Sequence, residues 1–298
     1  MQDIARDMTE IVAPDSPVEK VNDAPFVFLE GPVWDARRAR LFFTDPLAQT
    51  VHALREDGTF ATVMENSGYA NGMCLCPNGN LAICKMDTGS LNELDPDTGR
   101  LVRVIADGYE GRPFQATNDV VCDAGGGYYV TDPIFRYGPR GQSVEATYYC
   151  APDGRVQIAA RDSLKPNGLA FSPDGGTLYI DDTGSAKVWA YTVGADGTLT
   201  DPRVFCELVL PENATNLPPV QRYGEADGMK VDSLGNVYVT TISGIQVFNA
   251  LGGYLGIIRM PGEYSPANIA FGGGDLKTLY ITARIWLYAV RVRIAGLA

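Results

Sequence analysis

A unit of roughly 40 to 60 residues recurs along the chain, and this recurrence constrains the fold more than any other feature. Each copy joins an apolar run to a turn of the Pro/Asp-Gly type, followed by a strand that ends in Tyr, a hydrophobic residue and Thr or Asp. The copies open with polar residues at six positions: Glu30, Asn71, Asn118, Asn167, Asp227 and Asn268. This spacing suits four-stranded blades and is too long for leucine-rich or ankyrin repeats. The sequence therefore predicts an all-β fold, a six-bladed β-propeller with a central metal-binding tunnel.

The composition is compatible with one large core, since 45% of the residues are hydrophobic and only 20% are charged. A blade cannot bury its faces alone, so we predict a single propeller domain over residues 1–298. Residues 1–17 are predicted to be a surface segment, within which only residues 1–11 have weak helical character. Residues 18–29 are predicted to supply the outer strand of the last blade and to close the ring by strand pairing.

The net charge indicates which kinds of partner the protein is expected to bind. The chain has 36 acidic and 24 basic side chains and a formal charge of −12, which disfavours nucleic acid and anionic membranes. The first residues lack a basic region followed by an apolar run, and no apolar stretch of about 18 residues occurs. The six cysteines show no paired CxxC spacing, which favours reduced, buried thiols. We expect a cytoplasmic protein with a small-molecule substrate, and the oligomeric state stays open.

The polar residues that open the repeats predict a cation site, because the inner strands of a propeller converge on its axis. Carboxylate and amide oxygens gathered there suit Ca²⁺ at about 2.3 to 2.6 Å and suit Zn²⁺ poorly. Asn-Gly and Asp-Gly are also common turn dipeptides, so each position alone has a purely structural explanation. The identical phasing of these residues across the repeats favours the cation site. We expect Ca²⁺, with Zn²⁺, Mn²⁺ and Mg²⁺ as other possible ions.

Four segments carry a resemblance to a known family. They begin at Glu30-Gly-Pro-Val-Trp, Asn118-Asp-Val-Val-Cys-Asp, Lys165-Pro-Asn-Gly-Leu and Asp227-Gly-Met-Lys-Val-Asp. Together they resemble the successive signatures of the senescence-marker-protein (regucalcin)/gluconolactonase family, over nearly the whole chain. The resemblance implies a six-bladed propeller with a central catalytic divalent cation, and a function in the lactonase branch.

The resemblance also assigns roles to individual residues. It implies that the metal is bound by Glu30, Asn118, Asn167 and Asp227. Asp227 matches the residue that acts as general base or nucleophile in the family. Lactonases often carry an Asn shortly before the Asn-Asp pair, whereas this chain has Gln115 there. Substrate contacts are expected from Asn71, Gln115, Arg136, Tyr137 and Tyr223.

Other catalytic arrangements are limited by the single histidine, His52, which we interpret as a strand residue of the first blade. One histidine cannot form a His dyad, and no Gly-x-Ser-x-Gly elbow accompanies it to make a Ser-His-Asp triad. Metal-assisted chemistry is the remaining route. The repeat-equivalent pairs Thr44-Asp45 and Thr131-Asp132 are predicted to end strands and cap turns rather than to line the tunnel.

The leading functional hypothesis is a metal-dependent hydrolase that opens a sugar lactone or a related cyclic ester, with Asp227 as base or nucleophile. Two alternatives use the same propeller. In the first, the metal site cleaves phosphotriesters or catalyses a non-hydrolytic cyclisation or isomerisation in a biosynthetic pathway. In the second, the propeller is a non-catalytic platform that binds Ca²⁺.

Overall fold

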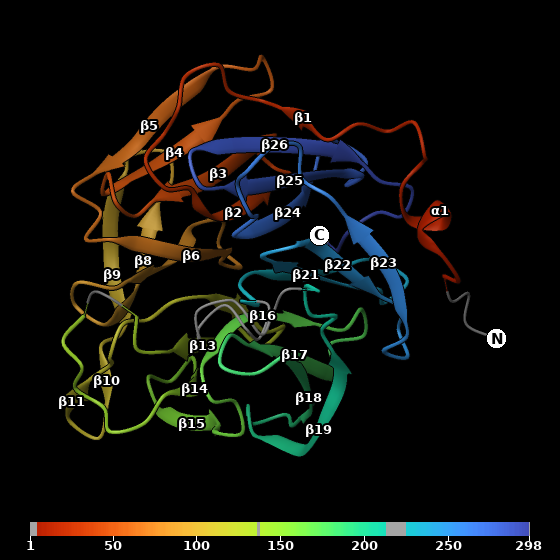
Figure 1. Cartoon of the computed structure of the whole chain (residues 1–298). Helices are drawn as coiled ribbons and strands as arrows, with labels where there is room; N and C mark the ends of the chain where they lie inside the picture. The colour runs from red at the N-terminus through yellow and green to blue at the C-terminus, as the bar shows by residue number, and fades with distance from the viewer. Residues whose placement is uncertain (1–4, 136–137, 213–224, 298) are drawn as a thin grey trace.

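A computed structural model of the protein describes residues 5–135, 138–212 and 225–297. Six four-stranded antiparallel sheets are arranged as blades around a central axis (Figure 1). In each of the first five blades, four strands consecutive in sequence lie side by side, and the first of them is nearest the axis. The predicted six-bladed β-propeller is thus confirmed.

The first half of the chain forms three blades and one extra hairpin. Blade 1 consists of β2 (Glu30–Asp35), β3 (Arg40–Asp45), β4 (Thr50–Leu54) and β5 (Phe60–Glu65). Blade 2 consists of β6 (Ala70–Leu75), β7 (Leu81–Lys85), β8 (Ser90–Asp95) and β9 (Arg100–Ala106). The hairpin consists of β10 (Gly108–Tyr109) and β11 (Arg112–Pro113). Blade 3 consists of β12 (Val120–Cys122), β13 (Tyr128–Asp132), β14 (Ala146–Cys150) and β15 (Val156–Ala160).

The second half forms the other three blades. Blade 4 consists of β16 (Pro166–Phe171), β17 (Thr177–Asp182), β18 (Lys187–Val193) and β19 (Leu199–Glu207). Blade 5 consists of β20 (Met229–Val231), β21 (Val237–Thr241), β22 (Gly244–Phe248) and β23 (Tyr254–Ile258). Blade 6 consists of β24 (Asn268–Gly272), β25 (Thr278–Ala283), β26 (Trp286–Arg291) and, from the other end of the chain, β1 (Glu19–Lys20).

The core lies between the faces of neighbouring blades. Residues that alternate along a strand point to opposite faces, so the apolar runs of each blade pack against two neighbours. Tyr238 of blade 5 and Phe271 of blade 6 illustrate this contact, with ring centroids 5.2 Å apart and ring planes at 90°. An edge-to-face pair of this kind adds about 0.5 to 1.5 kcal/mol beyond its buried area. The ring is therefore held together by packing between blades as much as by pairing within them.

The ring closes where β1 pairs with β26, in the register Glu19 with Ala289 and Lys20 with Tyr288. This confirms that the segment 18–29 supplies the closing strand, although only two of its residues pair as a strand. Side chains extend the closure, because Asn22 accepts a hydrogen bond from the Leu287 N–H at 2.8 Å. A single bridge between Val12 and Val292 adds a further fastening.

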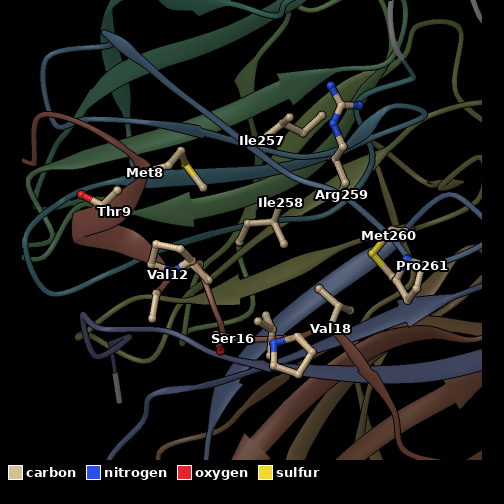
Figure 2. A pocket seen from close by; sticks show the side chains of 14 residues that line it. Met8, Thr9, Val12, Ser16, Val18, Ile257, Ile258, Arg259, Met260 and Pro261 are labelled. Atoms are coloured by element: carbon tan, nitrogen blue, oxygen red, sulfur yellow. The ribbon is translucent and has the colours of Figure 1, made fainter.

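The N-terminal segment is anchored along the outer side of the ring. Its helix, α1 (Met8–Ile11), is much shorter than the predicted 1–11, and it is the only helix in the described ranges. No helix there is long and apolar enough to cross a membrane. Ile11 is fully buried, so the segment is fixed to the core and does not simply lie on the surface. Figure 2 shows Met8 and Val12 facing residues 257–261 across a groove of about 610 Å³.

Candidate functional site

The polar residues that open the repeats meet in one cavity of about 400 Å³. Its lining includes five of the residues that the sequence singles out: Glu30, Asn71, Asn118, Asn167 and Asp227. Each lies within two residues of the start of an innermost strand, and they come from blades 1 to 5. Asp227 is partly exposed and the other four are buried. The repeat phase therefore brings all four predicted metal ligands together.

Two side-chain hydrogen bonds organise these residues into neighbouring pairs. Asn71 donates from Nδ2 to Oδ1 of Asn118 at 3.0 Å. Asn167 donates from Nδ2 to Oδ1 of Asp227, also at 3.0 Å. Among the described residues, the buried Oδ1 of Asn71 has no hydrogen-bond partner. An acceptor of this kind in a cavity is suited to a cation or to a ligand that donates a proton.

The two carboxyl groups of the cavity have strongly altered acidities. Burial raises the pKa of Glu30 well above its usual value, and the negative charge of Asp227 raises it further. Burial also raises the pKa of Asp227 to about 7, although the hydrogen bond from Asn167 opposes this shift. Buried carboxylates that lie close together disfavour each other's charged form. A divalent cation would reverse this penalty by replacing the bound protons.

The donor set fits a hard divalent cation. It consists of oxygen atoms only, two carboxylates and two amides, which is the chemistry of Ca²⁺ sites. The described residues contain no cluster of three Asp, Glu, His or Cys side chains with metal-binding geometry. Amide oxygens must therefore complete any cation site here, and the residues that could hold the ion are Glu30, Asn118, Asn167 and Asp227.

Three aspartates fix the backbone that leads to three of these residues. They are Asp45, Asp132 and Asp182, each the last residue of the second strand of its blade. Asp45 accepts hydrogen bonds from the N–H groups of Val27 and Phe28, at 2.8 and 3.0 Å. These donors lie three and two residues before Glu30. We call this arrangement the aspartate clamp.

The clamp recurs with the same spacing in blades 3 and 4. Asp132 accepts from the N–H groups of Gln115 and Ala116, both at 2.8 Å, three and two residues before Asn118. In the next blade, Asp182 accepts from the N–H groups of Leu164 and Lys165 at 2.9 and 2.8 Å, again three and two residues before the cavity residue. The prediction that Asp45 and Asp132 end strands and cap nearby backbone is confirmed. The clamps also hold the approach to the cavity in place.

The remaining predicted residues lie elsewhere or cannot be placed. Gln115 is buried, and its Nε2 donates to the Val144 carbonyl at 2.8 Å instead of lining the cavity. Arg136, Tyr137 and Tyr223 lie outside the described residues. His52 lies on β4, where its Nε2 is 2.8 Å from the Thr50 hydroxyl and its ring stacks on Phe43. Burial lowers its pKa, in line with a structural role in blade 1.

The rest of the cavity wall was missed by sequence reasoning. It consists of Phe28, Pro46, Leu47, Met86, Phe135, Thr183, Glu225, Ala226 and Arg284. Six of these residues lie in connections between the second and third strands of blades 1, 2, 3, 4 and 6: Pro46, Leu47, Met86, Phe135, Thr183 and Arg284. Their equivalent positions in the repeat could have identified them, because the same connection reaches the axis in each of these blades.

Comparisons with known proteins agree with this architecture. Residues 28–285 match the family described as SMP-30/Gluconolactonase/LRE-like region. The chain is 29% identical to a gluconolactonase of Zymomonas mobilis, across 90% of this chain and 79% of that protein. It is also 29% identical to a 6-deoxy-6-sulfogluconolactonase of Pseudomonas putida, across 87% and 84%. A solved gluconolactonase from Xanthomonas campestris superposes with a TM-score of 0.84 at 26% identity, covering 97% of this chain and 94% of that one. The chain belongs to the SMP-30/gluconolactonase/LRE-like family.

Proposed function

We propose that the protein is a divalent-metal-dependent hydrolase that opens lactones, with Glu30, Asn118, Asn167 and Asp227 as the metal ligands. One observation carries this proposal: two carboxyl groups with raised pKa values face one cavity beside two amides, an arrangement that a divalent cation would stabilise. The lactonases among the relatives supply the reaction class. Ca²⁺ is the ion we favour, because every ligand atom is an oxygen.

The chemistry divides between the cation and Asp227. A bound divalent ion supplies Lewis-acid polarisation of the lactone carbonyl. Asp227 is the one partly exposed ligand, and the hydrogen bond from Asn167 occupies only its Oδ1. Its Oδ2 can take a proton from the attacking water, or it can attack the carbonyl carbon itself. If Asp227 acts as base, the ring C–O bond breaks and the leaving alkoxide takes up the proton that Asp227 received. If Asp227 attacks directly, the ring C–O bond breaks to leave an ester with Asp227, and a water molecule then hydrolyses this ester and supplies the proton of the alkoxide.

The proposal is tested on protein stripped with a chelator and assayed on a panel of lactones with and without added Ca²⁺. We expect activity only with the metal, and at least a 10³-fold loss of kcat in Asp227→Asn, the order found when a catalytic group is removed. Glu30→Gln should weaken metal binding measured by calorimetry. Glu93→Gln is the matched control, because Glu93 is also a buried glutamate but pairs with Arg103 on blade 2. Activity that does not depend on metal would contradict the proposal.

Isotope-labelled water separates hydrolysis from the other reactions that the same site could catalyse. Hydrolysis incorporates one oxygen atom of the labelled water into the hydroxy acid, whereas a cyclisation or isomerisation leaves the product unlabelled.

We also propose a cytoplasmic location, because all six cysteines are free thiols. Fusion to a fluorescent protein and imaging in the source cell test the location separately.

A further inference from the structure

The wall of the cavity is divided into two arcs of different chemistry. The apolar arc consists of Phe28, Pro46, Leu47, Met86 and Phe135. The polar arc consists of Thr183, Glu225 and Arg284. The apolar arc belongs to blades 1, 2 and 3, and the polar arc belongs to blades 4, 5 and 6. Ala226 also lies on the second half, and both halves share the cavity with the polar residues at the starts of the innermost strands.

The apolar arc offers a substrate almost no hydrogen-bonding side chain. Met86 is 6% exposed, and Phe28 and Phe135 are half-buried. Leu47 is 44% exposed at the rim, which is unusual for a leucine whose neighbours in the wall are also apolar. A single exposed leucine needs no explanation, but a continuous apolar surface that lines a pocket marks a binding surface.

The polar arc has both donors and acceptors. The Thr183 hydroxyl accepts from Nδ2 of Asn167 at 3.0 Å and donates to the Ala226 carbonyl at 2.6 Å. The Arg284 guanidinium lies 4.9 Å from the centre of the Phe28 ring, so the two arcs meet at this contact. Among the described residues, the polar arc offers a substrate oxygen hydrogen-bond partners. The apolar arc offers none, so that a substrate oxygen on this half can reach only Glu30, Asn71 and Asn118.

We infer that this site takes lactones that carry an apolar alkyl or aryl substituent on the ring, with the substituent against the apolar arc. The inference rests on the proposed lactonase function, which concerns the lactone ring, and it adds the chemistry of the substituent on that lactone. A lactone with hydroxyl groups on every side would turn some of them toward Phe28, Leu47 and Phe135. A hydroxyl that loses its water and gains no partner weakens binding by roughly tenfold or more.

The test is a series of γ-alkyl-γ-butyrolactones from methyl to hexyl, assayed on the Ca²⁺-loaded protein beside D-glucono-1,5-lactone. We expect kcat/KM to rise by about fourfold for each methylene that the arc covers, until the cavity is filled. Leu47→Asn should lower kcat/KM for the hexyl lactone by about tenfold and for the methyl lactone much less. Leu251→Asn is the matched control, because Leu251 is also an exposed leucine in a tight turn but lies between β22 and β23, outside the cavity lining.

A second measurement separates this inference from the lactonase proposal. The corresponding γ-alkyl-γ-butyrolactams have the same shape but resist ring opening, and calorimetry gives their dissociation constants. Affinity that rises with chain length, without turnover of any lactone, would support the apolar arc and overturn the lactonase proposal. Turnover with no dependence on chain length, and with D-glucono-1,5-lactone as the best substrate, would overturn the inference and leave the lactonase proposal intact.

Discussion

Blades 1, 3 and 4 differ from blade 5 in how they hold their cavity residue. In the first three, an aspartate at the end of the second strand accepts two backbone N–H groups just ahead of Glu30, Asn118 or Asn167. In blade 5 the equivalent position at the end of β21 is Thr241, whose hydroxyl donates to the Gly244 carbonyl. Among the described residues, the approach to Asp227 therefore has no aspartate in the clamp position.

Asp227 is held instead by its neighbours. Its N–H donates to the Thr240 carbonyl at 3.2 Å, and its side chain accepts from Asn167 at 3.0 Å. The three clamped residues suit a passive ligand, because their backbone is fixed before anything binds. The one residue that we propose to exchange a proton or attack substrate depends on a neighbouring side chain. On this proposal, the ligands with a fixed backbone and the residue that reacts come from different blades.

The largest effect is expected when the clamp is removed in blade 4. Asp182→Ala leaves the N–H groups of Leu164, Lys165 and Gly184 without their acceptor. A backbone donor that loses its acceptor costs about 1 to 3 kcal/mol when it is buried, and these donors are only partly buried. We therefore take the lower part of that range for each and expect a loss of about 4 kcal/mol in the free energy of unfolding, measured in urea. Asp174→Ala is the control, because Asp174 accepts similar bonds in an exposed turn of the same blade. Equal losses in the two variants would show that the clamp has no special role.

The next effect is the pH dependence of the metal-free protein. The pKa of Asp227 is about 7 when folded, against about 3.8 for the free side chain, so the folded state binds the proton more tightly. Stability from this group is complete below pH 4 and is lost as the pH rises toward 7, at up to about 1.4 kcal/mol per pH unit. Melting curves in chelator should therefore shift downward over this range. The shift should be smaller in Asp227→Asn, and an identical shift would contradict the assignment.

A smaller effect is expected when the hydrogen bond between Asn167 and Asp227 is removed. Asn167→Ala removes the donor to Asp227, so the carboxylate loses orientation as well as one neighbouring ligand. We expect metal affinity to fall by at least the 10- to 100-fold that is typical when an orienting partner is lost. Asn71→Ala, which removes a donor to Asn118, is the comparison. We expect the smaller loss of metal affinity in Asn71→Ala. A greater loss there than in Asn167→Ala would contradict the importance that we assign to the Asn167–Asp227 pair.

The smallest effect is expected at the position that replaces the clamp in blade 5. Thr241→Val keeps the side-chain shape and removes the bond to Gly244, at a cost of about 1 kcal/mol in stability. Metal affinity, measured by calorimetry, should be unchanged because Thr241 does not hold the approach to Asp227. A clear drop in affinity would mean that blade 5 is supported like the others.

Much of the architecture could be predicted because it repeats. The phase of Glu30, Asn118, Asn167 and Asp227 predicted that they would meet, since equivalent positions in a closed ring are brought to one axis. Met86 and Arg284 occupy equivalent turns, so the repeat could locate them, but their residue types differ from blade to blade and do not indicate a shared function. Gln115 shows a different limit. Its amide could reach a ligand or a backbone carbonyl, and only the fold of the Val144 loop decides between them.

Closure of the ring through β1 and β26 has a consequence for synthesis on the ribosome. Glu19 is synthesised 270 residues before its strand partner Ala289 (289 − 19). Contacts so far apart in sequence form late, because their entropic cost must be met before they stabilise the structure. Blade 6 is therefore completed only after β26 has left the ribosome, long after β1 has been made. The ring is therefore completed late, when β1 pairs with β26.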